Sequence, residues 1–216
     1  MRGMKKTQGF TLVEIAIVLV IIGLLLGGIL KGQEMITQAK IKNVIGDFSG
    51  IAAAYHGYQD RYRAVPGDDP NAATRWTGAT AGSGNGVVAG TYNSATATDE
   101  ARLWWDHLRR AGFVSGTGTA QPFNATSGII GVQTGDGAAT PGVALGSFFS
   151  TIICSSNLPD KIAIAVDNQM DDGDARAGNV RSQLQTAGPN PAINAAADTN
   201  NYAETGTNAY TMCRTL

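Results

Sequence analysis

Four carboxylates gather within eight residues in the segment 167–174, which reads DNQMDDGD. Carboxylate oxygens around a tight turn are the ligands that Ca²⁺ prefers, and Gly173 permits such a turn. The spacing is not that of an EF-hand loop, and acids around a glycine are also typical of a solvated surface turn. Two interpretations therefore stay open, a calcium site and a solvated acidic loop, and both concern Asp167, Asp171, Asp172 and Asp174.

Cys154 and Cys213 are the two cysteines of the chain, and both lie in its last third. They are not spaced as a CxxC redox pair, and an even number of cysteines in an oxidising compartment is typical of a disulfide. Two unpaired buried thiols are the alternative, because a sequence cannot show that two sulfur atoms meet. Export of the chain would favour the disulfide.

No recognisable catalytic constellation accompanies these residues, since the sequence has no GxSxG, HExxH or phosphate-binding glycine loop. His107 has no histidine or cysteine at ligand spacing, which favours a satisfied or surface histidine over a metal ligand. The 16 basic residues include three before residue 7, so the body, which holds the 17 acidic residues, is mildly acidic and no nucleic-acid partner is evident. We predict that the chain is not an enzyme and requires no cofactor.

An apolar run of 21 residues from Phe10 to Leu30 contains one carboxylate, that of Glu14. At about 1.5 Å per residue the run covers roughly 30 Å, enough to cross the hydrocarbon core of a membrane. A charge costs about 2.5 to 3.5 kcal/mol near the bilayer centre and less near the interface, so it normally has a partner. Glu14 is therefore expected to need a cation, unless its carboxylate reaches back to the membrane surface.

Basic residues precede this run at Arg2, Lys5 and Lys6, and none follows until Lys31. This asymmetry predicts that the amino end stays cytoplasmic and that the remainder is exported. A cleavable secretory signal would have a shorter apolar core and a small-residue cleavage site, which is missing near Leu30. The sequence therefore predicts a single membrane span with an exported body.

The segment Lys5-Lys6-Thr7-Gln8-Gly9-Phe10-Thr11-Leu12-Val13-Glu14 resembles the prepilin processing motif of type IV pilins and of type II secretion pseudopilins. The shared features are a short basic leader, a glycine, a phenylalanine and a glutamate as the fifth residue after the cut. The resemblance implies that a prepilin peptidase cuts between Gly9 and Phe10 and then methylates the new amino terminus. A glycine before the scissile bond lets a protease approach the backbone closely, because it has no Cβ.

On this resemblance the cut supplies the cation that Glu14 needs, since Phe10 gains an α-ammonium group that stays positive when methylated. We infer that Glu14 pairs with the Phe10 amine of a neighbouring subunit as the helices stagger in a filament. Leaving either charge unpaired costs several kcal/mol, so the pair can check the register of assembly. Phe10 and Glu14 are therefore the predicted assembly residues.

Beyond Lys31 an apolar stripe continues the helix. Its members recur in steps of three and four, which places them on one helix face: Ile41, Val44, Phe48, Ile51, Tyr55, Tyr58 and Tyr62. The sequence predicts one helix from Phe10 to about Tyr62, ended by Val65-Pro66-Gly67. Residues 1–9 are then the leader, 10–31 the transmembrane or filament-core helix, 32–64 its amphipathic half, and 65–216 a globular head.

The head is predicted to be α+β. A short helix is expected after Thr98-Asp99-Glu100, and an antiparallel sheet is expected from four β-branched or aromatic stretches, Ile129 to Val132, Val143 to Cys154, Lys161 to Val166 and Tyr210 to Cys213. A long helix packed on such a sheet agrees with the pilin fold that the resemblance implies. A Cys154–Cys213 disulfide would then close the carboxy-terminal loop region, in which some pilins and pseudopilins hold calcium.

The expected function is that of a structural subunit of a type IV pilus-like filament, assembled through its first helix. The alternative is a minor pilin or a type II secretion pseudopilin whose head binds a partner or a surface. The implied partners are identical or related pilin subunits, prepilin peptidase, the membrane and the inner-membrane assembly machinery. The subunit is expected in the inner membrane with a periplasmic head before assembly, and in an extracellular pilus or periplasmic pseudopilus afterwards.

Overall fold

The computed structural model describes residues 11–216, so the predicted leader and the Gly9–Phe10 cleavage site lie outside the described residues. The chain divides into two compact units, the first ending at Ala39 and the second spanning Lys40–Leu216. The boundary falls inside the predicted amphipathic half of the first helix, residues 32–64. The described part of the first unit is entirely helical beyond Thr11.

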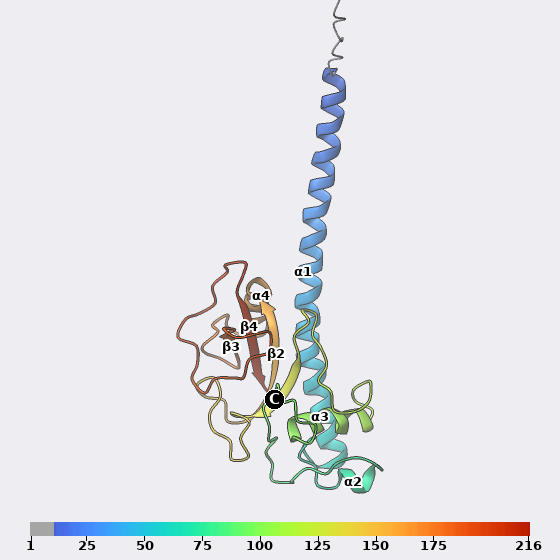
Figure 1. Ribbon diagram of the computed structural model, residues 1–216, viewed down its shortest axis with the longest axis vertical. Coiled ribbons are helices and arrows are strands. Elements are labelled where there is room, and N and C mark those ends of the chain that lie inside the picture. The colour runs from blue at the N-terminus through green and yellow to red at the C-terminus, as the bar shows by residue number, and fades with distance from the viewer. Residues whose placement is uncertain (1–10) are drawn as a thin grey trace, which may run out of the picture. The chain divides into compact units, whose positions relative to one another are not determined.

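Helix α1 runs from Leu12 to Tyr62, which confirms the predicted long helix and its end (Figure 1). It stops one residue before Arg63, whose φ is 53°, and Val65-Pro66 then prevents further helix. From residue 11 to residue 31 every side chain is exposed, whereas from Ile41 onward one face is buried. The helix thus changes from apolar all round to amphipathic along its length.

The second unit combines residues 40–62 of α1 with three shorter helices and a sheet. Helices α2 (Ala72–Arg75) and α3 (Glu100–Arg110) precede the sheet in sequence, and helix α4 (Asp160–Met170) follows its second strand. The strands are β1 (Ile130–Thr134), β2 (Thr151–Pro159), β3 (Val180–Leu184) and β4 (Ala209–Thr215). They pair antiparallel in the order β1-β2-β4-β3. The predicted α+β, pilin-like fold class is therefore confirmed.

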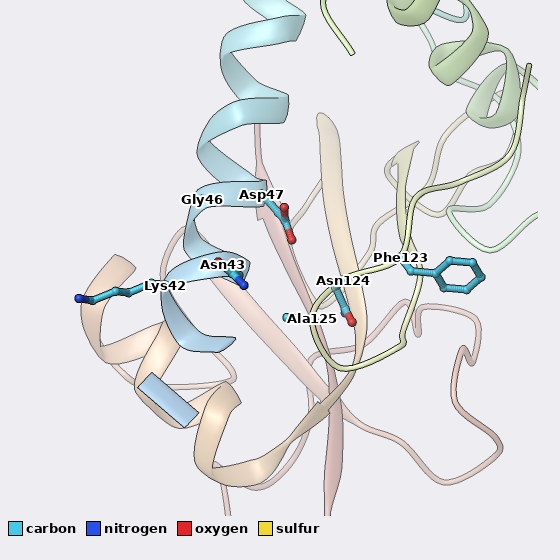
Figure 2. A pocket seen from close by; sticks show the side chains of 7 residues that line it. All are labelled: Lys42, Asn43, Gly46, Asp47, Phe123, Asn124 and Ala125. Atoms are coloured by element: carbon cyan, nitrogen blue, oxygen red, sulfur yellow. The ribbon is translucent and has the colours of Figure 1, made fainter. Parts of the chain in front are cut away.

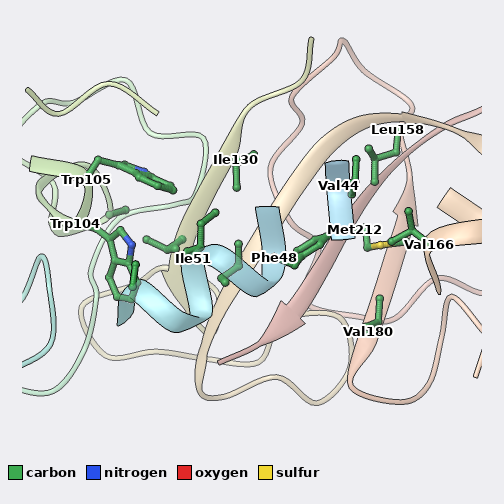
Figure 3. Close-up of a cluster of buried hydrophobic side chains, with 14 of the residues drawn as sticks. Val44, Phe48, Ile51, Trp104, Trp105, Ile130, Leu158, Val166, Val180 and Met212 are labelled. Atoms are coloured by element: carbon green, nitrogen blue, oxygen red, sulfur yellow. The ribbon is translucent and has the colours of Figure 1, made fainter. Parts of the chain in front are cut away.

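The core lies between the second half of α1 and the sheet. Figure 3 shows Val44, Phe48 and Ile51 of α1 in one buried cluster with strand residues such as Ile130 and Met212. Trp104 and Trp105 of α3 belong to the same cluster and are fully buried, so they anchor this helix to the core. Burial of apolar surface, worth about 25 cal/mol per Å², therefore fixes α1 and α3 on the sheet.

The predicted strand from Lys161 to Val166 is wrong, because this segment lies in α4. The buried residues Ile162, Ala163 and Val166 follow helical spacing, and Asp160 supplies an acid in the first helical turn. An apolar run of six residues is too short for its periodicity to separate a helix from a strand. The acid after a proline was the local signal for a helix start.

Two further differences concern the sheet. The predicted strand from Val143 to Cys154 begins only at Thr151, since the residues before it form a turn with an isolated bridge between Ala144 and Phe148. Strand β3 is not predicted, because Val180 is its one buried apolar residue and its other buried residues, Ser182 and Gln183, are polar. Gln183 is satisfied there by donating to the carbonyl of Ala192 and accepting from the backbone N–H of Asn194.

Cys154 and Cys213 form a disulfide, which confirms the predicted pairing. The two residues lie directly opposite each other on the neighbouring strands β2 and β4, and both are fully buried. They are 59 residues apart in sequence, and the chain between them contains α4 and β3. The bond therefore fixes the register of the two central strands as well as closing the carboxy-terminal region.

Replacing both cysteines, as Cys154→Ala with Cys213→Ala, is expected to lower the free energy of unfolding by about 2 to 5 kcal/mol. The reason is that the unfolded chain regains the freedom that the cross-link removes. Urea unfolding of the purified chain in detergent measures the change, and reduced wild-type protein should match the double variant. An unchanged unfolding midpoint would contradict a stabilising role for the bond.

Candidate functional site

The first unit presents an apolar surface on every side of the helix. Among its described residues the exposed large apolar side chains are Leu12, Val13, Ile15, Ile17, Val18, Leu19, Val20, Ile21, Ile22, Leu24, Leu25, Leu26, Ile29, Leu30, Met35 and Ile36. Within residues 11–216, α1 is the single helix long and apolar enough to cross a membrane, with a mean hydropathy of 2.8 over its best 18-residue window. An apolar surface of this extent requires lipid or other protein around it.

Glu14 takes part in a capping box at the start of α1. Its Oε2 accepts hydrogen bonds from the backbone N–H and the hydroxyl of Thr11, both at 2.8 Å. In return, the Glu14 backbone N–H donates to the Thr11 hydroxyl at 3.3 Å. This reciprocal pattern satisfies N–H groups that a helix start leaves free, and it places a negative charge at the positive end of the helix dipole. The T-x-x-E spacing was the sequence signal for this box.

Pairing of Glu14 with the Phe10 amine stays a prediction, because Phe10 and Gly9 lie outside the described residues. The described residues nevertheless show which oxygen of the Glu14 carboxylate is available for this pairing. All hydrogen bonds that they give to the Glu14 carboxylate reach Oε2. The other oxygen, Oε1, is therefore accessible to a cation without opening the capping box.

The acidic segment brings three of its four predicted residues together. Oxygens of Asp167, Asp171 and Asp172 lie within 4.8 Å of one another, and Asp167 is fully buried at the end of α4. Asp174 instead forms an ion pair with Arg176 at 2.8 Å, and the hydrogen bond from Arg176 lowers the pKa of Asp174 to about 2. The described residues therefore offer a cluster of three carboxylates rather than four.

Hydrogen bonds from the protein already occupy this cluster. Asp167 accepts from the Tyr202 hydroxyl at 2.5 Å and from the Gly173 backbone N–H at 3.2 Å, and burial raises the pKa of the Asp167 carboxyl. Asp171 accepts from the backbone N–H groups of Asn179 and Val180 at 2.5 and 2.9 Å. Ca²⁺ takes 6–8 oxygen ligands, of which this cluster supplies only a part. Calcium binding here stays a prediction.

His107 is fully buried and uses both ring nitrogens. Nδ1 accepts a hydrogen bond from the Gly67 backbone N–H at 2.9 Å, and Nε2 lies 2.8 Å from the Thr80 carbonyl oxygen. An N–H can only donate and a carbonyl can only accept, so the ring is neutral with its proton on Nε2. The prediction of a satisfied histidine is thus confirmed, and its role is to hold residues 67 and 80 against α3.

Asp68 holds the connection between α1 and α3 in place, although its sequence context predicts only a turn. It is buried and accepts hydrogen bonds from the Ser83 hydroxyl and from the backbone N–H groups of Gly84, Asn85 and Gly86, at 2.6 to 3.0 Å. Gly67 precedes it with φ of 85°, and a Cβ there would lie 2.4 Å from the Glu100 carbonyl oxygen. A buried carboxylate therefore folds the glycine-rich connection, which a turn-forming interpretation does not anticipate.

Comparison with known proteins identifies the amino-terminal segment. The prokaryotic N-terminal methylation motif matches residues 4–30, a range that contains Gly9, Phe10 and Glu14. This motif is the signature of type IV pilins and pseudopilins, so the resemblance inferred from the sequence is confirmed for this segment. No curated protein and no solved structure gives a significant match to the chain.

A calcium site in the acidic cluster predicts that CaCl₂ raises the melting temperature of the chain, because a ligand that binds only the folded state stabilises it. Asp172→Asn should abolish that rise, since it removes one charged ligand and none of the hydrogen bonds described for Asp167 and Asp171. MgCl₂ at the same concentration is the control for ionic strength. Equal melting temperatures with and without calcium would support a loop held by hydrogen bonds alone.

Acid is expected to destabilise the head through His107. Burial lowers the pKa of His107, while Asp106 raises it and Arg75 and Arg110 lower it; the Tyr58 ring also stacks on the imidazole. The unfolded state therefore binds more protons below about pH 6.5, so the free energy of unfolding falls as pH falls, by up to about 1.4 kcal/mol per unit.

Urea unfolding between pH 7.5 and pH 5 tests this expectation. His107→Gln keeps a donor and an acceptor at the same place and should flatten the dependence on pH. His56→Gln, at an exposed histidine, is the matched control and should leave the wild-type slope unchanged. A slope that persists in His107→Gln would assign the effect to other groups.

Proposed function

We propose that this chain is a structural subunit of a type IV pilus-like filament, processed by prepilin peptidase and polymerised through its first helix. The observation that carries the proposal is that the N-terminal methylation motif over residues 4–30 overlaps the first part of α1, whose described residues up to Leu30 are exposed and mostly apolar. The motif supports processing, and the exposed surface supports assembly. A structural role also fits the α+β head, whose disulfide is typical of an oxidising compartment outside the cytoplasm.

Processing creates the charge on which assembly depends. Hydrolysis of the peptide bond between Gly9 and Phe10 leaves a carboxylate on Gly9 and an α-amine on Phe10. Methylation of that amine keeps its positive charge. The charge then lies four residues before Glu14, whose Oε1 accepts no hydrogen bond from the described residues.

The free energy that favours assembly comes from a charge pair rather than from additional hydrophobic burial. A helix that leaves lipid for a filament core gains little from the hydrophobic effect, because lipid tails are as apolar as leucine. Contacts between helices and the pairing of Glu14 with a neighbouring Phe10 amine are then the favourable terms. Close contacts between helices are possible at four positions without a side chain, Gly23, Gly27, Gly28 and Gly32. A Cβ added at any of them would meet no atom of the described chain within 4 Å, so these positions are open to a neighbouring helix.

The proposed route begins with a single-pass precursor in the inner membrane and a head in the periplasm. The assembly machinery then extracts the subunit into a filament of identical or related subunits. The matched motif is shared by pilins and pseudopilins, so an extracellular pilus and a periplasmic pseudopilus are two forms of the same proposal. Mass spectrometry of sheared surface filaments distinguishes them, because only the pilus places this chain outside the cell.

Glu14→Ala is expected to enter the membrane and be cut and methylated at Phe10, yet to reduce the yield of sheared filaments by at least about tenfold. The reason is that each incoming subunit would leave a Phe10 ammonium group without its partner. Glu14→Gln should behave in the same way, since it keeps the capping hydrogen bonds but not the charge.

Asp60→Ala is the matched control, because Asp60 is an exposed acid of the same helix with only a long, 3.9 Å ion pair to Arg63. It should give wild-type filaments. Immunoblots of the sheared fraction and mass spectrometry of the amino terminus measure yield and processing separately. Normal filaments from both Glu14 variants would refute the charge-pair mechanism.

A further inference from the structure

A surface groove in the second unit lies between α1 and the segment 123–125. It has a volume of about 420 Å³ and is lined by Lys42, Asn43, Gly46, Asp47, Phe123, Asn124 and Ala125 (Figure 2). In Figure 2, Asp47 extends from α1 on the side of Asn124, whereas the Lys42 side chain and the Phe123 ring point away from the groove. The lining residues include neither the predicted assembly residues nor any residue of the acidic segment.

The wall that α1 gives to this groove has no side chain at one position, Gly46, and Lys42, Asn43 and Asp47 form the rest of that wall. Gly46 is exposed, and beyond the groove the exposed face of α1 continues with the small residues Ser49, Gly50 and Ala53. A Cβ added to Gly46 or Gly50 would meet no atom within 4 Å, so no contact inside the chain requires glycine. Each glycine in an exposed helix costs about 1 kcal/mol relative to alanine. The missing side chains would allow another molecule to approach α1 closely.

Asp47 gives the groove a charge that the chain does not neutralise. Its carboxylate is partly buried, and within residues 11–216 it has neither a hydrogen bond nor an ion pair. A partly buried charge without a partner is unfavourable, so a cation brought into the groove from outside would be stabilised. Charge complementarity therefore calls for an occupant with a basic side chain.

Lys42 is the complementary group on the same helix. It is exposed, and among the described residues it also has no ion pair. At about 100° per residue, Lys42 and Asp47 project roughly 140° apart around α1, so they cannot pair within one chain. They can pair between two chains, with Lys42 of one copy meeting Asp47 of the next. Such a contact is heterologous, and a heterologous contact that does not close generates a helical filament.

We propose that this groove is a contact surface for a second copy of the chain, with Lys42 of one copy paired to Asp47 of its neighbour. The inference rests on the proposed filament function, and it adds a head-level contact to the pairing at the amino terminus. A second copy is the occupant because α1 forms both the groove and the apolar surface that requires neighbours. The missing side chain at Gly46 lets the neighbouring chain come close enough for the two charges to meet.

Charge exchange in the full chain tests the pairing. Asp47→Lys and Lys42→Asp should each reduce sheared filaments by about tenfold, and the combined exchange should restore much of the yield, because it reverses both charges of one pair. Asp60→Lys is the matched control, since it makes the same change at an exposed acid of α1, and it should assemble normally. Loss in both single variants without recovery in the combined variant would overturn the pairing.

Gly46→Leu tests the groove independently of charge. The added side chain meets open space within the subunit and favours helix, so the melting temperature should not fall, yet the filament yield should fall by about tenfold. A stable, processed Gly46→Leu chain that assembles like wild type would overturn the inference.

The two proposals fail in different ways. Absence of filaments from the wild-type chain, or normal filaments from the Glu14 variants, would refute the proposed function itself. Normal assembly of Gly46→Leu and Asp47→Lys, alongside loss in Glu14→Ala, would remove only the groove contact. Phe10 methylation and the Cys154–Cys213 disulfide report in every variant whether the chain was processed and folded.

Discussion

The rest of this structure depends on one constraint: the apolar surface of residues 12–30 must be shielded from water. No part of the described chain covers it, since every residue from 11 to 31 is exposed. Lipid would meet the requirement for a single subunit, and neighbouring helices would meet it in the proposed filament. Because both surroundings are apolar, the hydrophobic effect does not choose between them. In the proposed assembly route, polar and charged groups on the same helix would then decide when the subunit leaves the membrane.

The second half of α1 meets a different requirement, because it lies against a folded head. From Ile41 onward its apolar residues lie on one face of the helix. That face is buried with β-strand residues and with Trp104 and Trp105 of α3. The opposite face keeps small residues such as Gly46 and Gly50, which the head does not use. One continuous helix therefore joins a segment shielded by its surroundings to a segment shielded by its own chain.

Buried polar groups organise the head as much as its apolar core does. Asp68, His107 and Asp167 are each buried, and each is satisfied by donors or acceptors from another part of the chain. Such groups are costly unless every partner is present, so they hold their loops in one arrangement. This explains how a chain rich in glycine, alanine and threonine forms ordered connections with few apolar side chains. It also ties the stability of the head to pH.

The sequence by itself determined the features that depend on neighbouring residues: the long first helix that ends near Tyr62, the methylation motif, and the helix near Trp104. Their periods and spacings are local, so a linear pattern contains them. Only the tertiary structure decided that Lys161 to Val166 is helical, that Asp68 binds backbone groups 16 to 18 residues ahead, and that Asp47 faces the segment 123–125. Those outcomes depend on which distant segments supply partners and burial. A buried acid and a solvated acid look the same in sequence, because the difference between them is set by groups brought close only when the chain folds.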